Sequence, residues 1–325
     1  MALLKFAAAA LAWLGRQGTR AVAISIFVGL ALPQLAAVFK PYVTGQIFLL
    51  LCLAFLRVDP AALIGHVRRP RLSLAAAVWS VLVLPALLGG LYLLAGLDRF
   101  PDLFLSLVLQ IATPPIMSAP AFAALLGLDA ALSLSLLVIS VALTPIVAPI
   151  IVTIFVGTSV EISPIDLGIK LFLLLAGAAL LAGVVRLIAG APWVERQRDS
   201  IDGLNVIILF AFAVALMEEV HARIFADPLL VLGLTALTFV LSLGIVAVTM
   251  LLFRPAGAAR AFAVGLSAGH RNMGLMLAAT GGLVPDLTWL YFALAQFPIY
   301  LLPYLLGPLA RRLQAAPWSE SVSKS

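Results

Sequence analysis

Long apolar stretches, separated by short charged or Gly/Pro-rich segments, make up most of this chain. A helix needs about 20 mostly apolar residues to cross a bilayer core about 30 Å thick. Ten stretches approach or exceed that length. The first half holds Ala21–Phe39, Tyr42–Leu56, Ser73–Gly96, Phe100–Gly127 and Ala130–Gly157, and the second holds Leu167–Gly190, Asp202–Val220, Pro228–Phe253, Ala258–Gly282 and Leu287–Leu309. The pattern predicts an all-α membrane protein with ten transmembrane helices.

The distribution of Lys and Arg supports this count. With ten spans, 15 of the 20 Lys and Arg residues fall on the side that also holds both termini. The opposite side has only four, namely Lys40, Arg99, Lys170 and Arg223, and Arg271 remains inside a span. Because Lys and Arg are enriched in cytoplasmic loops, we expect both termini in the cytoplasm and the protein in a cell inner membrane or plasma membrane.

Composition excludes several other classes of protein. The chain is 64% apolar and 10% charged, whereas soluble domains are about 45–50% apolar and about 25% charged. The positive-inside rule accounts for the net charge of +6, so we expect no nucleic-acid partner. Cys52 is the only cysteine, which excludes a disulfide framework. We interpret Phe6–Leu14 as an interfacial lead-in and Asp59–Arg71 as a segment along the cytoplasmic face.

Five spans in each half predict an inverted repeat, because an odd number makes the halves enter the membrane from opposite sides. We expect one repeat in residues 1–158, the second in 159–312 and a polar cytoplasmic tail in 313–325. The fourth and ninth spans are both interrupted. The interruptions are Thr113-Pro114-Pro115-Ile116-Met117-Ser118-Ala119-Pro120 and Ser267-Ala268-Gly269-His270-Arg271-Asn272-Met273-Gly274.

Matching breaks of this kind predict a binding site near the middle of the membrane. Prolines remove backbone donors, and unpaired backbone groups persist at this depth only beside protein or a water-filled cavity. Free N–H groups and the positive ends of half-helices suit an anion. We expect Arg271 to pair with it, Asn272 to hydrogen-bond to it, and His270 to bind it or a proton. The other expected substrate-binding residues are Thr113, Ser118 and Gln296.

These residues resemble the bile acid:sodium symporter family, whose superfamily also includes arsenite and auxin efflux carriers. The resemblance extends from about Ala21 to Leu309. It rests on the segment from Asp129 to Ser133, on Thr144-Pro145 with Pro149, and on Gly269-His270-Arg271-Asn272-Met273-Gly274-Leu275. It implies broken spans 4 and 9 that cross, a panel domain of spans 1, 2, 6 and 7, and a core domain of spans 3–5 and 8–10. It also implies that the substrate binds between the two domains.

The chain departs from this family where sodium would bind. Sodium-dependent members have Ser-Asn after a Gly-rich stretch at the first break, where this chain has Met117-Ser118-Ala119-Pro120. They have Glu and Gln at the second, where this chain has Ser267 and Arg271. A guanidinium about 4 Å from a cation repels it by about 4 kcal/mol at an effective dielectric of 20. The remaining candidate oxygen ligands for an ion are Asn272, Ser118, Ser140, Thr144 and Ser267.

We therefore expect a secondary transporter for a small organic anion, with degraded sodium sites and no cofactor. Arg271 would supply the positive charge that sodium supplies in relatives. A sodium-coupled bile-acid-type symporter, a metalloid or auxin efflux carrier, and a passive channel stay open as alternatives. The sequence does not predict an oligomeric state.

Other signals indicate no enzyme activity. Gly265-x-Ser267-x-Gly269 fits a hydrolase nucleophile elbow, but it lies inside an apolar helix, where the two glycines favour close helix packing. There is no metal-binding or phosphate-binding motif. Glu218 and Glu219 are predicted to end the seventh span at the outer surface, or else to form a gate or proton relay.

Overall fold

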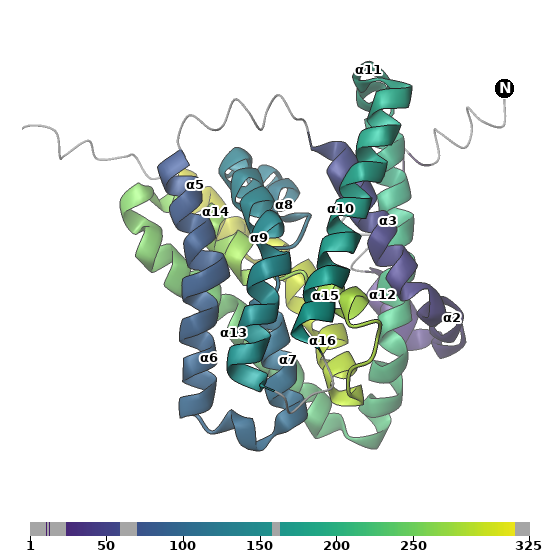
Figure 1. The fold of residues 1–325 in the computed structure, drawn as a ribbon, viewed down its shortest axis with the longest axis vertical. Helices are drawn as coiled ribbons and strands as arrows, with labels where there is room; N and C mark the ends of the chain where they lie inside the picture. The colour runs from purple at the N-terminus through teal and green to yellow at the C-terminus, as the bar shows by residue number, and fades with distance from the viewer. Residues whose placement is uncertain (1–10, 12, 14–23, 59–69, 158–162, 316–325) are drawn as a thin grey trace, which may run out of the picture.

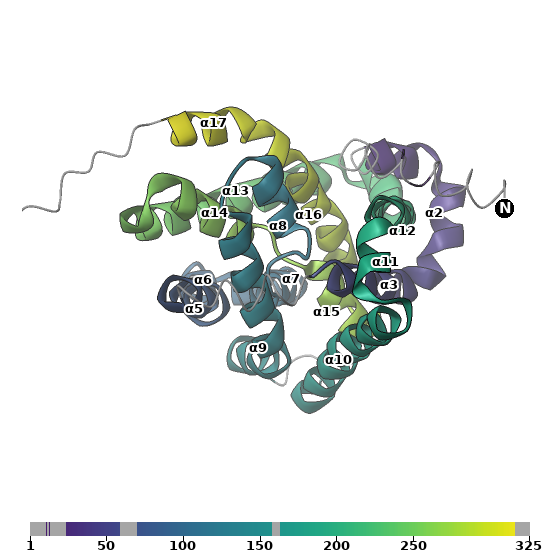
Figure 2. The same cartoon turned by 90° about the horizontal axis from the view of Figure 1, so that it is seen from above.

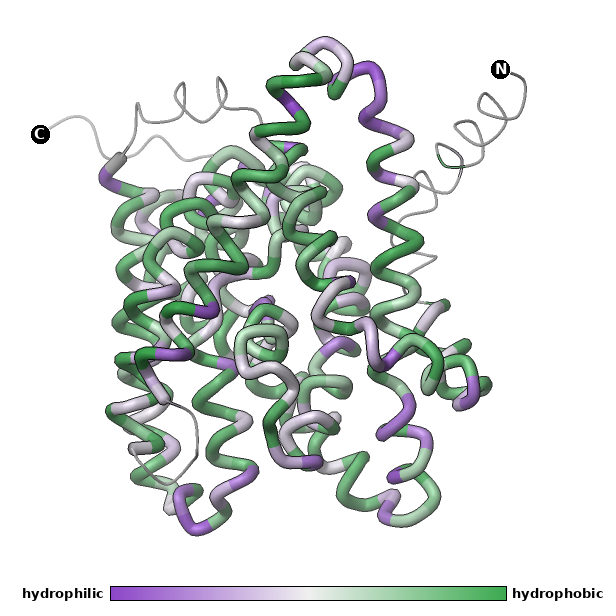
Figure 3. Tube along the Cα trace, turned by 45° about the vertical axis from the view of Figure 1, so that its right-hand side comes forward, coloured by the Kyte–Doolittle hydropathy of each residue, from purple (hydrophilic) through white to green (hydrophobic). Residues whose placement is uncertain are grey.

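The computed structural model describes residues 11, 13, 24–58, 70–157 and 163–315. Six helices within these ranges are long and apolar enough to cross a membrane, or seven if a bent pair is counted as one span. Polar residues gather mostly toward the ends of the helices, whose length is largely apolar (Figure 3). The protein is therefore an all-α, multi-pass membrane protein. The expected lead-in Phe6–Leu14, apart from residues 11 and 13, and the expected surface segment Asp59–Arg71, apart from its last two residues, lie outside the described residues. Pro70 and Arg71 begin helix α5 (Pro70–Val78).

The helices form two groups that lie side by side (Figures 1 and 2). The first group contains the described helical residues 24–31 and α2 (Pro33–Phe39), α3 (Val43–Arg57), α10 (Pro164–Ala189), α11 (Ala191–Arg196) and α12 (Arg198–Ala226). The second contains α5 (Pro70–Val78), α6 (Leu84–Leu94), α7 (Pro101–Ala112), α8 (Ala119–Leu125), α9 (Ala130–Val156), α13 (Pro228–Phe253), α14 (Ala258–Gly269) and α17 (Gly307–Ala315). Helices α15 (Met273–Ala279) and α16 (Asp286–Leu305) lie between the two groups.

Several helices match the expected spans closely, and two regions differ. Helix α13 has the expected bounds, and α9 is one residue shorter than expected. The first two expected spans are not separated by a loop: a single 3₁₀ turn, Lys40–Tyr42, joins α2 to α3, and Pro33–Arg57 forms one candidate span. Helix α12 continues to Ala226, so Glu218 and Glu219 lie inside the helix rather than at its end. After Glu219 the helix continues through a mostly apolar segment, Val220–Ala226, which contains no Gly or Pro to end it.

The C-terminal end of the bundle also differs from expectation. Helix α16 ends at Leu305, earlier than the expected Leu309, and α17 follows at an angle of 42°. Residues 313–315, expected to begin a polar tail, belong to α17. Pro298 and Pro303 lie within α16, and a short turn at Leu306 allows the change of direction.

The expected close packing at Gly265 and Gly269 is confirmed. A Cβ at Gly265 would lie 2.8 Å from the Val246 carbonyl oxygen of α13, and one at Gly269 would lie 2.6 Å from the Val246 Cγ2. The absent side chains therefore let α14 approach α13 to backbone contact, as small residues do between membrane helices.

Gly269→Ala is expected to lower the stability of the protein by about 1–3 kcal/mol, the usual cost of overpacking. The new methyl group would meet both Val246 and the Ser242 carbonyl oxygen, 2.9 Å away. Thermal unfolding in detergent measures the loss. Gly244→Ala on α13 is the matched control, because nothing lies within 4 Å of its added Cβ. Equal melting temperatures for the two variants would contradict the packing argument.

Candidate functional site

The two interrupted helices meet at their breaks. Pro115 and Arg271 form an isolated antiparallel bridge. The Ile116 N–H donates to the His270 carbonyl at 2.8 Å, and the Asn272 N–H donates to the Pro114 carbonyl at 2.9 Å. Backbone groups that cannot bond within their own helices thus bond across the break, which removes part of the cost of burying them.

Arg271 is buried beside this crossing, with 1% of its surface exposed. Its Nη1 donates to the Thr113 carbonyl at 2.8 Å, and Nη1 and Nη2 both donate to the Ser80 carbonyl, at 3.1 and 3.0 Å. Its Nε has no hydrogen-bond partner among the described residues. No carboxylate in the described part of the chain forms an ion pair with it. The guanidinium is therefore held by carbonyl dipoles, and no described carboxylate balances its charge.

The helix α5–α6 provides one of these carbonyls because it contains a π-helical turn at Trp79–Val83. The Leu84 N–H, which would serve the Ser80 carbonyl in an α-helix, donates to Trp79 instead. The next residue, Pro85, has no N–H. The Ser80 carbonyl is thus left without a helical donor, and Arg271 satisfies it. The sequence analysis did not predict this contact. Pro85 inside the third span is the signal that could have indicated it, because a proline within a helix leaves one carbonyl of the preceding turn without its N–H donor.

A cavity of about 430 Å³ begins at the crossing and lies between α3 and α12 on one side and α8, α9, α15 and α16 on the other. It extends to Arg57 and Arg198 at one end of the bundle, where Arg57 pairs with Asp202. Of the described residues that line the cavity, Asp202 is the only carboxylate, against three arginines. The polar lining residues are Arg57, Ser118, Arg198, Asp202, Asn205, Arg271, Asn272, Gln296 and Tyr300. The rest of the lining is predominantly apolar.

Four of the expected substrate-binding residues line the cavity: Arg271, Asn272, Ser118 and Gln296. Asn272 also caps α15 through its Oδ1, which accepts the Leu275 N–H at 3.3 Å. Gln296 donates through Nε2 to the Phe292 carbonyl at 3.2 Å.

The other two, His270 and Thr113, are not part of this lining. His270 is fully buried, with Nδ1 2.7 Å from the Leu266 carbonyl and its ring edge-on to Phe122. The Thr113 hydroxyl donates to the Gln110 carbonyl at 2.7 Å. Their positions favour a structural contribution at the crossing over contact with a ligand.

The expected ion ligands do not gather around one point of the cavity. Ser267 and Ser133 share a buried hydrogen bond of 2.7 Å between α14 and α9. The Thr144 hydroxyl donates to the Ser140 carbonyl at 2.7 Å within α9. Of the five candidates, only Asn272 and Ser118 line the cavity. Among the described residues there is also no group of three or more His, Cys, Asp and Glu side chains that could hold a metal ion.

Sequence reasoning missed Tyr300 and the cavity mouth. Tyr300 lies four residues after Gln296 on α16, so helical spacing places both on one face. Its hydroxyl is buried and has no hydrogen-bond partner among the described residues. Arg57 and Asp202 are 145 positions apart by their residue numbers, and no local pattern connects them.

A second polar cluster lies away from the cavity, where α12 packs beside α16. Lys40 contacts Glu218 and Glu219, each at 2.8 Å, and lies 5.9 Å from the centre of the Trp289 ring. Arg223 of α12 lies 4.0 Å from the Asp286 carboxylate at the start of α16. Lys40 and Arg223 thus connect the first helix group to α16.

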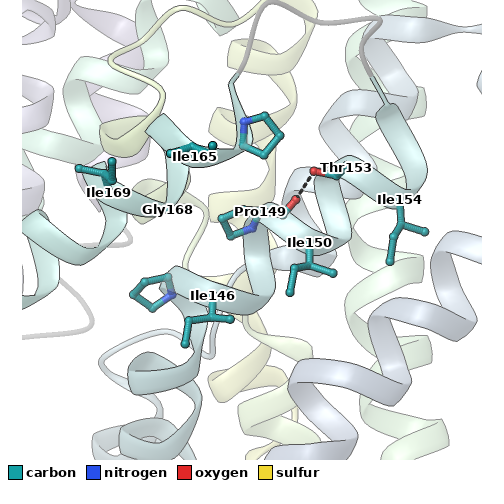
Figure 4. A pocket seen from close by; sticks show the side chains of 10 residues that line it. Ile146, Pro149, Ile150, Thr153, Ile154, Ile165, Gly168 and Ile169 are labelled. Atoms are coloured by element: carbon teal, nitrogen blue, oxygen red, sulfur yellow. Dashed lines mark hydrogen bonds between the residues drawn. The ribbon is translucent and has the colours of Figure 1, made fainter.

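A separate apolar hollow, between α9 and α10, is open to the surface (Figure 4). Isoleucines and prolines line it, and its single hydroxyl, Thr153, donates to the Pro149 carbonyl at 2.8 Å. Its described lining offers no free polar side chain to select a ligand.

Comparisons of the chain with protein-family models and with curated proteins find no match. The fold and the cavity define the class, a multi-pass α-helical membrane protein with an internal polar cavity.

Proposed function

We propose that this protein is a secondary transporter that moves a small organic anion across the membrane by alternating access. The observation that carries the proposal is the buried guanidinium of Arg271 on the cavity wall, without a counterion among the described residues. Burying a charge is costly unless an opposite charge or strong hydrogen bonds compensate it. An anion in the cavity would supply the missing negative charge.

Two unsatisfied donors on lining residues also support an anionic ligand. The Arg271 Nε and the Tyr300 hydroxyl are both buried, and neither has a hydrogen-bond partner in the part of the chain that the structure describes. Unpaired buried donors are uncommon and destabilising, and carboxylate or sulfonate oxygens would accept from them. Asn272, Ser118 and Gln296 add neutral hydrogen-bonding groups on the same cavity. In this arrangement Arg271 attracts the anion while remaining held by the Ser80 and Thr113 carbonyls.

The proposed architecture is two inverted five-helix repeats, with a first element whose beginning lies outside the described residues. The paired breaks α7–α8 and α14–α15 support it, because each lies at the corresponding place in its half of the chain. The panel domain corresponds to the first helix group, and the core domain to the second group with α15 and α16. The cavity between them supports movement of one domain against the other. We also propose that the structure is in an inward-facing state, because the end of the cavity near Arg57 (the Arg57 mouth) lies on the side expected to be cytoplasmic.

Transport is proposed to be independent of sodium. The guanidinium already donates hydrogen bonds to the Ser80 and Thr113 carbonyl oxygens. Carbonyl oxygens are hard ligands of the kind that a sodium ion needs, so these two are not free to bind one. The carrier would then act as a uniporter, an exchanger or a proton-coupled transporter.

Purified protein, screened by thermal shift against a panel of mono- and dicarboxylates and sulfonates, is expected to be stabilised by at least one anion. Uptake of that anion into proteoliposomes is expected to be saturable and equal, within about twofold, in sodium and in choline buffers, because the guanidinium replaces the ion. Liposomes without protein are the control. A steep sodium dependence would contradict the sodium-independent mechanism, and unsaturable flux would indicate a channel.

A further inference from the structure

Helix α17 lies across the end of the second helix group rather than continuing the direction of α16 (Figure 2). Its buried face is formed by Ala310, which is 0% exposed and belongs to a cluster with Phe122, Ala123, Phe262 and Leu266. That cluster contains residues of α8 and α14, the two half-helices that meet at the breaks. Helix α17 is therefore packed directly against the crossing elements.

Exposed cations and exposed apolar side chains occur together on α17 and the adjoining end of α16. Arg311 and Arg312 are both exposed, and no carboxylate in the described ranges pairs with either. At the end of α16, Tyr304 is 45% exposed and Leu305 is 65% exposed, and Leu309 of α17 is 37% exposed. A short helix with apolar residues, arginines and a neighbouring tyrosine is typical of a segment that lies in the membrane interface.

One hydrogen bond connects this surface to the broken helix. The Gln314 Nε2 donates to the carbonyl of Leu126, the residue that caps the C-terminus of α8. Arg260 of α14 and Asp129, which precedes α9, lie 3.6 Å apart at the same end of the bundle. Helix α17 thus contacts the end of α8 through the Gln314 hydrogen bond, and it packs against α8 and α14 around Ala310.

We propose that α17 is a binding surface for anionic phospholipid headgroups, and that this binding stabilises the α8 half-helix. Arg311 and Arg312 bind the headgroup phosphates of the adjacent leaflet, while Tyr304, Leu305 and Leu309 contact the first carbons of the acyl chains. The occupant is a lipid because the surface follows directly from a membrane-spanning helix and because two arginines that pair with no carboxylate of the described residues complement phosphate. This proposal does not depend on the transported substrate.

The test is thermal unfolding of the full chain in nanodiscs of phosphatidylcholine alone or mixed with phosphatidylglycerol. Wild-type protein is expected to melt about 2–5 °C higher in the anionic discs. The Arg311→Gln/Arg312→Gln variant is expected to lose this rise and to match wild type in phosphatidylcholine. The Arg99→Gln/Lys170→Gln variant, which removes two cations from exposed positions elsewhere, is expected to keep it. No rise in wild type, or an equal loss in both variants, would overturn the proposal.

Gln314→Ala separates lipid binding from its effect on α8. This variant is expected to retain phosphatidylglycerol through purification, as measured by native mass spectrometry, and to show a smaller rise in melting temperature. The arginine variant is expected to retain less of the lipid. Undiminished retention by the arginine variant would place the lipid elsewhere and refute the assignment to α17.

Discussion

Arg271→Met is expected to cause the largest loss of stability of any single substitution on the cavity wall. Methionine leaves the Ser80 and Thr113 carbonyls without the donors that now satisfy them. An unsatisfied buried group costs about 1–3 kcal/mol, which gives about 2–6 kcal/mol for the two. Removal of the buried charge offsets part of this cost, so the expected loss is near the lower end of that range. Thermal unfolding in detergent measures it. Binding of the stabilising anion is expected to disappear in the same variant, because its positive charge is lost.

Arg271→Lys separates the two effects of Arg271, which are anion binding through its charge and stability through its bonds to the two carbonyls. Gln296→Ala is the comparison for anion binding. Lysine keeps the charge but cannot bridge both carbonyls with a fork, so part of the anion binding is expected to remain while stability still falls. Gln296→Ala lies on the same cavity and is expected to weaken binding only about 2–10-fold, the effect of one hydrogen bond. Similar, mild effects for Arg271→Met and Gln296→Ala would contradict the proposed site.

Cross-linking α12 to α16 at Arg223 and Asp286 is expected to abolish transport reversibly. In the proposed mechanism these residues belong to the panel and core domains, which must separate for the cavity to open away from the Arg57 mouth. The experiment uses Arg223→Cys/Asp286→Cys with Cys52→Ala, because Cys52 is the only native cysteine. A bifunctional methanethiosulfonate reagent spans the pair, whose present side chains approach to 4.0 Å. Uptake is expected to fall to the level of empty liposomes and to return after reduction.

The single-cysteine variants, treated with the same reagent, control for simple modification at either position. They are expected to keep most of their activity, since the Asp286 side chain is 80% exposed, the Arg223 side chain is only half-buried, and a salt bridge so placed contributes little stability. Full transport by the cross-linked protein would show that α12 and α16 do not separate here. Alternating access would then need another moving contact, such as the one between Lys40 and Trp289.

The sequence was sufficient to predict the breaks and the apolar spans around them. Pro114 and Pro115 lack N–H donors, and Gly269 and Gly274 flank a polar segment, so continuous helix is disfavoured by local chemistry alone. The apolar length of α9 and α13 likewise determines where each helix begins and ends, because crossing a bilayer depends on consecutive residues. The presence of Arg271 within a span was evident for the same reason.

Only the tertiary structure decided how these elements use their polar groups. The Ser80 carbonyl becomes available through a π-helical turn in another span, and the Arg271 side chain reaches it only after the helices pack. The pairing of Arg57 with Asp202 and the burial of His270 also depend on contacts between distant segments. Local pattern determines which residues are helical and apolar, whereas the partner of a buried polar group depends on which carbonyls packing leaves unsatisfied.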